Sequence, residues 1–275
     1  MTTAPPRQAA GAAENTALIH RLALSARQHL PAAGILAGVA GAWEAASLWL
    51  GVPGYILPSL NSIWSTAVMQ WRGTLASATA VTTLEVLLGF ALSVVVALAI
   101  GFALHISRML RDAIYPLLIG SQAVPIVVIA PVLAIIFGYS LTPKLLVVAL
   151  ICFFPIVVNT VDGLGSVEPE LLRVMRTLDG GRWATLTRIE APAALPSIFS
   201  GLRIAATYAP IGAVFGEYSG SQNGLGYVMI QAIPQLETAL VFAAIFILTG
   251  EAVVLFIAIS LLERLACPWA RKGKQ

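Results

Sequence analysis

Long apolar segments separated by short polar ones dominate this sequence. A helix needs roughly 20 apolar residues to cross a bilayer hydrocarbon core of about 30 Å. Six stretches reach or approach that length, near residues 31–50, 79–104, 113–138, 143–161, 195–216 and 239–262. This pattern predicts an all-α integral membrane protein with six transmembrane helices.

Prolines interrupt two of these stretches. The third contains Pro116, Pro125 and Pro131, and the fourth contains Pro155. Each proline removes a backbone hydrogen bond, which a helix that lines a cavity tolerates better than a helix that faces lipid. We therefore predict that the third and fourth stretches bend around a pathway.

The composition supports membrane insertion. Of the 275 residues, 58% are hydrophobic and only 11% are charged, whereas a soluble domain carries about 25% charged residues. The net charge of +3 comes from basic residues scattered between apolar stretches. They form no continuous patch, so we predict no nucleic-acid partner.

The distribution of Lys and Arg predicts the orientation of the helices. Thirteen of the 16 basic residues fall on one side of the six stretches, Arg72 and Lys144 fall on the other, and Arg203 lies inside the fifth stretch. Because basic residues in short loops stay on the cytoplasmic side, both termini are expected in the cytoplasm.

Three regions are expected along the chain. Residues 1–30 form a cytoplasmic tail in which positions 19–30 have helical periodicity, typical of an interfacial helix; a solvated tail is the alternative. Residues 31–265 form the six-helix transmembrane domain, and residues 266–275 form a basic cytoplasmic tail.

The longest cytoplasmic loop, residues 163–194, contains a predicted amphipathic helix. Pro169 suits the first helical position, and the glycines at 180 and 181 suit a helix end. The apolar face consists of Leu171, Val174, Met175 and Leu178, and the polar face of Arg173, Arg176 and Thr177. A second short segment is expected over residues 182–190, ending before Pro192. The apolar face either docks another protein or covers its own helix bundle.

This loop resembles the EAA loop of binding-protein-dependent ABC importer permeases, in which a short cytoplasmic helix docks into the ATPase subunit. Asp179, Ile189 and Pro192 have the spacing of the Gly, Ile and Pro of that loop. Residues 173–175 differ from the usual Glu-Ala-Ala, and Asp179 replaces the usual Gly. The resemblance implies that the ATPase contact consists of Leu171, Arg173, Val174, Met175, Arg176, Leu178, Asp179 and Gly180.

Most of the chain beyond its tail is similar to the same family. The most specific segments are 122–125, 130–131, 137–139, 153–155 and 159–160, and the segments 216–218 and 224–227 also match. They are similar to permeases of the nitrate, sulfonate and taurine group, and most like those for thiamine pyrimidine precursors or riboflavin. The resemblance implies the type I importer (MetI-like) permease fold.

Polar residues within the apolar stretches are candidates for function, because buried polar groups destabilise a protein in lipid. Candidates for the translocation path are Gln122, Pro125, Asn159, Glu217 and Tyr218. The alternative for Gln122 and Asn159 is hydrogen bonding between helices. The sequence leaves the roles of Glu44, Glu85 and Glu251 open.

The resemblance implies a permease subunit of an ATP-driven importer in the bacterial cytoplasmic (inner) membrane. Its expected partners are two cytoplasmic ATPase subunits, a second permease copy in a homodimer, an extracytoplasmic solute-binding protein and the lipid bilayer. A thiamine pyrimidine precursor or related heterocycle is the expected substrate, and a sulfonate, taurine or nitrate is the alternative.

The sequence also bears on catalysis. It has no GxxxxGK phosphate loop, no HExxH or CxxC metal pattern and no GxSxG nucleophile motif. We therefore predict no catalytic residue, metal or cofactor in this chain, with ATP and magnesium held by the partner ATPase. One rival function is an ion-coupled secondary transporter with Glu44, Glu85 and Glu251 as proton carriers. An intramembrane enzyme is the least favoured rival.

Overall fold

The computed structural model describes residues 31, 33–49, 51–177 and 181–269, and all regular structure in these ranges is helical. The chain forms two compact units, Met1–Ile63 and Trp64–Gln275. The predicted interfacial helix at 19–30, the basic tail from 270 and the residues Leu178, Asp179 and Gly180 lie outside the described residues.

Within the unit Met1–Ile63, helix 33–49 packs against the segment that follows it. The Glu44 carboxylate accepts a hydrogen bond of 2.7 Å from the amide of Leu60, the first residue of α2 (Leu60–Gln70). The Trp43 indole donates to the Pro58 carbonyl at 2.9 Å. Glu44 therefore satisfies a backbone donor at the start of the next helix, which is a structural role.

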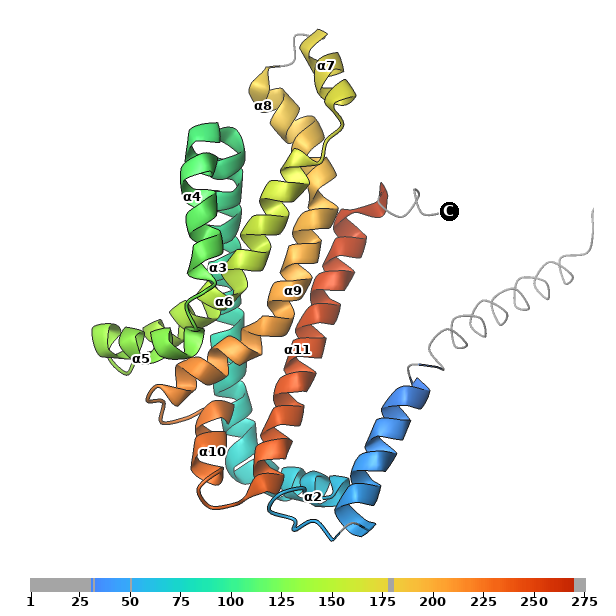
Figure 1. Ribbon diagram of the computed structural model, residues 1–275, viewed down its shortest axis with the longest axis vertical. Coiled ribbons are helices and arrows are strands. Elements are labelled where there is room, and N and C mark those ends of the chain that lie inside the picture. The colour runs from blue at the N-terminus through green and yellow to red at the C-terminus, as the bar shows by residue number, and fades with distance from the viewer. Residues whose placement is uncertain (1–30, 32, 50, 178–180, 270–275) are drawn as a thin grey trace, which may run out of the picture. The chain divides into compact units, whose positions relative to one another are not determined.

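The unit Trp64–Gln275 contains the rest of α2 and the helices drawn from cyan to red in Figure 1. In chain order these are the π-helical turn η1 (Trp71–Leu75), α3 (Ala76–Ile106), α4 (Arg108–Ser121), α5 (Ile126–Phe137), α6 (Leu141–Gly165), α7 (Pro169–Thr177), α8 (Arg182–Thr185), the π-helical turn η2 (Leu186–Glu190), α9 (Ala191–Tyr218), α10 (Leu225–Ala232) and α11 (Thr238–Ala266).

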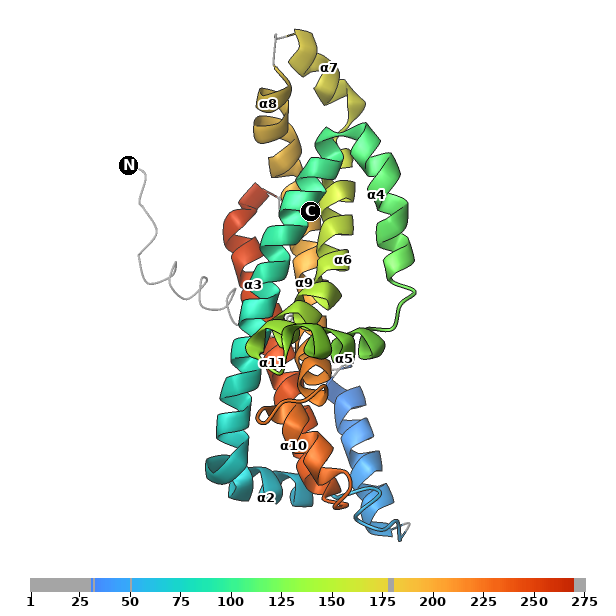
Figure 2. The same ribbon diagram turned by 90° about the vertical axis from the view of Figure 1, so that its left-hand side faces the viewer.

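The core of this unit lies among α3, α6 and α9, with α11 packed along α9 (Figures 1 and 2). Glycines let the three central helices approach closely. A Cβ at Gly89 of α3 would lie 2.5 Å from the Val148 Cβ, and one at Gly212 of α9 would lie 2.8 Å from the Val148 Cα. Close packing through small residues is what drives helix association in lipid, where the hydrophobic effect between helices is weak.

Four helical segments in the described ranges are long and apolar enough to cross a membrane: Leu60–Ile106, Leu141–Gly165, Arg182–Tyr218 and Thr238–Ala266. The last three, together with α3 inside the first, contain four of the predicted apolar stretches. Helix 33–49 lies within the first predicted stretch, but residues 32 and 50 beside it are not described. The count of six spans stays a prediction.

The third predicted stretch, 113–138, is bent, as its prolines predicted, and the bend is sharp enough to divide it into two helices. The structure divides it into α4 and α5, which meet at 100° across a break of four residues. Pro125 precedes α5 with an extended backbone, φ −63° and ψ 123°. A proline lacks the amide donor and disfavours helix at the residue before it, so the chain turns here instead of continuing. By contrast, α6 is one continuous helix through Pro155.

The amphipathic helix predicted within residues 163–194 begins at Pro169, as expected. The second segment was predicted to end at residue 190, before Pro192, and this end was wrong. The helix continues through Pro192 to Tyr218. The turn η2 is π-helical, with the Ala191 amide bonded to the Leu186 carbonyl, and Pro192 then falls in the first turn of α9. Pro192 has no amide to donate, and it follows directly on the π-helical turn, where the hydrogen-bond register of the helix already changes.

Candidate functional site

The helix α7 lies at one end of its unit, next to α8, in the uppermost part of Figure 1. Its apolar side chains are only partly covered: Leu171 is 48% exposed and Val174 is 53% exposed, whereas Met175 is partly buried. Arg173 on the other face is exposed. Exposed apolar side chains on a short amphipathic helix are typical of a surface that binds another protein.

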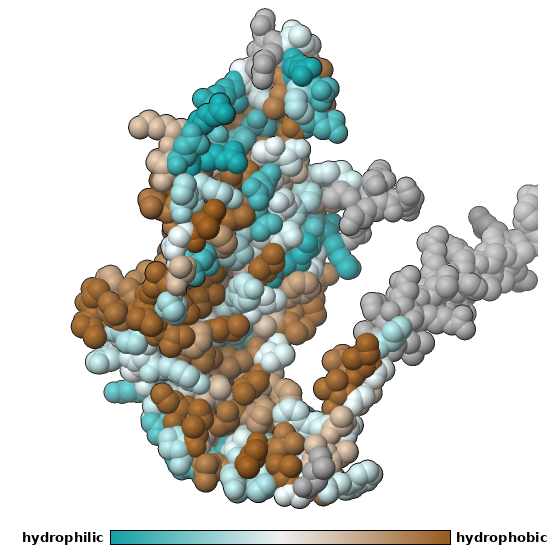
Figure 3. Space-filling model, viewed as in Figure 1, coloured by the Kyte–Doolittle hydropathy of each residue, from teal (hydrophilic) through white to brown (hydrophobic). Residues whose placement is uncertain are grey.

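A polar cavity of about 720 Å³ lies beside α7. Its lining comes from the turn between α3 and α4, from α7, and from α8 and η2: His105, Ile106, Arg108, Leu172, Arg182, Thr185, Leu186 and Glu190. In the surface view this end carries most of the hydrophilic side chains (Figure 3). Leu172 is the α7 side chain that lines the cavity.

Two contacts around this cavity join α8 and η2 to the end of α3. The imidazole Nε2 of His105 lies 3.0 Å from the Glu190 carboxylate, and the Arg182 guanidinium donates to the Ile106 carbonyl. Sequence reasoning missed both contacts, because the partners lie 85 and 76 positions apart. They hold α8 and η2, which follow α7 in the chain, against the end of α3.

The candidate path residues occupy three places. Gln122 and Pro125 are both exposed in the turn between α4 and α5. Asn159 is partly buried in α6, where its amide donates to the Pro155 carbonyl at 2.8 Å. Tyr218 packs edge-to-face on Phe215, with ring centroids 6.4 Å apart, at the end of α9.

Glu217, the fifth candidate, lies near the end of α9 and is 1% exposed. One carboxylate oxygen accepts from the Thr82 hydroxyl at 2.6 Å. The other accepts from the amides of Gly226 and Tyr227 at 2.5 and 3.3 Å. These amides belong to the first turn of α10, where a carboxylate is stabilised by free donors and by the helix dipole. Glu217 thus holds α10 against the end of α9.

Two further glutamates lie on the neighbouring helices. Glu85 of α3 accepts a hydrogen bond of 2.7 Å from the Lys144 ammonium of α6, and the pair is buried, with side-chain exposures of 1% and 14%. Lys144 also donates to the Ser221 hydroxyl at 2.7 Å. Glu251 of α11 accepts from the Thr83 hydroxyl at 2.6 Å. We call Glu85, Glu217 and Glu251 with these partners the glutamate cluster.

The glutamate cluster links α3 to α6, α9, α10 and α11, and it accounts for two charges whose roles the sequence left open. Sequence reasoning used Lys144 only to orient the helices and missed its pairing. A lysine and a glutamate in separate apolar stretches were a usable signal, since a buried charge in a bundle is usually paired.

Residues 89–266 match the family described as binding-protein-dependent transport system inner membrane component. The chain belongs to this family. The match spans most of α3 and continues through α11, so it includes α7, Lys144 and Glu217. The permease is thus a membrane subunit of an ABC importer, as its EAA-like loop indicates.

Full-length relatives agree with this assignment. The permease is 35% identical to the formylaminopyrimidine transport permease protein of Halalkalibacterium halodurans, over 84% of this chain and 92% of the relative. It is 37% identical to the riboflavin transport system permease protein of Chloroflexus aurantiacus, over 82% and 85%. It is 28% identical to the taurine transport system permease protein of Escherichia coli, over 82% and 84%.

Proposed function

We propose that this permease forms the translocation path for a pyrimidine precursor of thiamine or a related heterocycle, delivered by an extracytoplasmic binding protein. The relatives named for formylaminopyrimidine and riboflavin transport are 35% and 37% identical to it, and the one named for taurine transport is 28% identical. The higher sequence identity to the first two relatives favours a heterocyclic substrate over a sulfonate.

A partner ATPase would bind α7 on the cytoplasmic side. The observation that carries this proposal is the half-exposed apolar face of Leu171 and Val174 beside the exposed Arg173. A groove on the ATPase would cover the apolar side chains, and an acidic rim would pair with the arginine. ATP and magnesium would be held by that partner, with two ATPases and two permeases in the complex and both permease termini in the cytoplasm.

The long helix from Arg182 to Tyr218 would transmit a movement of α7 to the opposite side of the membrane. This helix has 37 residues, or about 55 Å at 1.5 Å per residue. One end is tied to α3 by the His105–Glu190 pair, and the other holds α10 through Glu217. When the ATPases close and move α7, the bundle would therefore rock as a rigid body between inward-open and outward-open states.

Within this proposal the path residues have different roles. Gln122 and Pro125 are exposed at the sharp α4–α5 turn and would face the solute. Asn159 and Tyr218 are partly buried and would shape the path wall. Glu217 is fully engaged by Thr82 and the start of α10, so it would act by positioning α10.

The ion-coupled alternative receives less support from the geometry. The Glu85 carboxylate is paired with Lys144, and Glu44 accepts the amide of Leu60. A proton carrier must be free to lose and regain its proton during transport, whereas these two groups stabilise helix contacts and a helix start.

Transport assays with candidate substrates test the proposed specificity. The permease is reconstituted in vesicles with its partner ATPase and binding protein, and labelled formylaminopyrimidine, riboflavin or taurine is supplied with the binding protein. We expect formylaminopyrimidine to accumulate fastest, and an excess of unlabelled taurine to leave its rate unchanged. Faster uptake of taurine would overturn the heterocycle assignment while leaving the permease assignment intact.

A further inference from the structure

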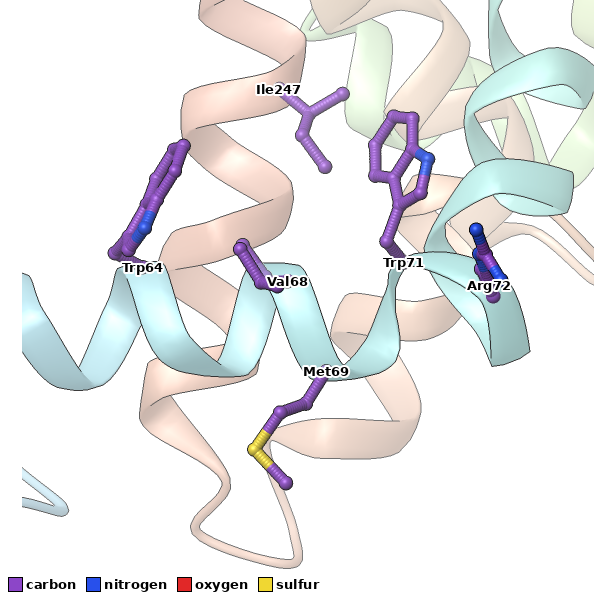
Figure 4. A pocket seen from close by; sticks show the side chains of 7 residues that line it. Trp64, Val68, Met69, Trp71, Arg72 and Ile247 are labelled. Carbon is purple, nitrogen blue, oxygen red and sulfur yellow. The ribbon is translucent and has the colours of Figure 1, made fainter.

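An apolar groove of about 500 Å³ lies between the end of α2, the turn η1 and α11, all within the unit Trp64–Gln275. Its lining residues are Trp64, Ala67, Val68, Met69, Trp71, Arg72 and Ile247. Figure 4 shows the indoles of Trp64 and Trp71 on either side of Val68, on the side of the helix that faces Ile247, with Arg72 next to Trp71. The groove is open: Trp64 is 71% exposed and Trp71 is 45% exposed.

The length of α3 places this groove at a membrane interface. α3 has 31 residues and begins directly after η1, so it extends about 46 Å, close to the 40–45 Å of a bilayer with its headgroup regions. Trp71 and Arg72 therefore lie near the level of the lipid headgroups. Tryptophan is enriched at that depth because its ring is apolar and its N–H is polar.

Arg72 carries an uncompensated charge at this level. It is exposed, and among the described residues no hydrogen bond or ion pair to its guanidinium is found. Lys144, the other basic residue assigned to this side of the membrane, is by contrast held by Glu85 at 2.7 Å. An arginine against the positive-inside pattern and without an internal partner calls for an anion from outside the chain.

We propose that the groove binds one anionic phospholipid of the adjacent leaflet. Its phosphate lies on the Arg72 guanidinium, whose planar donors match two phosphate oxygens. One acyl chain lies in the groove between Trp64 and Trp71, against Val68 and Ile247. The lipid would anchor the π-helical corner at which α2 passes into α3. This proposal requires a membrane-embedded chain and is independent of the substrate.

Fluorescence quenching by brominated lipids tests the proposal. The full-length permease, alone and with its partner proteins, is placed in phosphatidylcholine vesicles that contain brominated phosphatidylglycerol or brominated phosphatidylcholine at equal mole fraction. Because a basic side chain near the surface favours an anionic headgroup, we expect about fivefold stronger site occupancy by phosphatidylglycerol. Arg72→Gln should reduce this ratio to about one, and Arg72→Lys should give an intermediate ratio, because the charge remains while the two-donor fit to the phosphate is lost.

Two variants control for other effects. Arg264→Gln removes an exposed arginine from the last turn of α11 and should leave the ratio unchanged. Trp64→Ala should weaken quenching of the remaining groove tryptophan by both lipids equally, since it removes a chain contact and not the charge.

Four results would overturn the proposal. They are an unchanged ratio in Arg72→Gln, equal quenching of the wild-type permease by the two lipids, loss of the preference when soluble glycerol phosphate is added, and loss of quenching when the partner proteins are bound. The third would indicate a small-anion site, and the fourth would indicate a protein that covers the groove.

Discussion

A Val174→Asp substitution should release the partner ATPase and abolish transport while the permease stays folded. Val174 is 53% exposed on α7, so the permease itself loses little when a carboxylate replaces it. In a docked complex the same carboxylate would be buried without a partner, which costs about 3–5 kcal/mol. Co-purification of the ATPase, measured beside the thermal unfolding of the isolated permease in detergent, checks both parts of this prediction.

Thr177→Asp provides the matched control for that variant. Thr177 is exposed at the last position of α7 and belongs to its polar face. The added charge is the same, and its effect on the helix dipole is about 0.5 kcal/mol, so the ATPase should remain bound. If Val174→Asp permease retained both its ATPase and its transport rate, α7 would not be the docking helix. If it unfolded at a lower temperature instead, α7 would belong to the permease's own core.

A Lys144→Ala substitution should produce the largest loss of stability in the glutamate cluster. The variant leaves the Glu85 carboxylate, 1% exposed, without its cation, and it also removes a donor to Ser221. Loss of one partner from a buried ion pair lowers the free energy of unfolding by about 3–5 kcal/mol. Thermal unfolding of the purified permease in detergent measures the loss, and ATPase binding at α7 should persist at temperatures below unfolding.

The double variant Glu85→Gln with Lys144→Met tests whether the loss of stability comes from an unpaired buried charge. Removing both charges should restore most of the stability lost in Lys144→Ala, because no buried charge is left unpaired. An unfolding temperature for Lys144→Ala equal to that of the wild type would show that the pair does not stabilise the contact between α3 and α6.

Apolar segment length located the long helices well, and the prolines predicted that the third stretch bends but not that it divides into two helices. The helices α6 and α11 extend their predicted stretches by only a few residues at each end, because a lipid environment requires long apolar runs. Hydropathy does not distinguish one span from two apolar helices joined by a turn. At Pro125 the chain turns because of the backbone conformation that proline imposes, and mean hydropathy does not reveal this turn.

The two parts of the candidate site, α7 and the glutamate cluster, differed in how well the sequence predicted them. The start of α7 at Pro169 follows from signals within a single turn, so it was predictable. The partners in the glutamate cluster were not, because Thr82 and Glu217 are 135 positions apart and meet only after α3 and α9 pack. Polar residues in apolar stretches were the available signal for Glu85 and Glu251, whereas Glu217 was a candidate because the segment 216–218 resembles the permease family.

Uptake into vesicles with all ion gradients collapsed tests most directly whether ATP drives this permease through α7. The wild-type complex, with its binding protein outside and ATP supplied to the ATPase side, should accumulate substrate equally well with and without ionophores, and should stop when ATP is withdrawn. The Val174→Asp complex should fail under every condition. Accumulation that an imposed proton gradient drives without ATP, and that Val174→Asp leaves intact, would contradict this coupling.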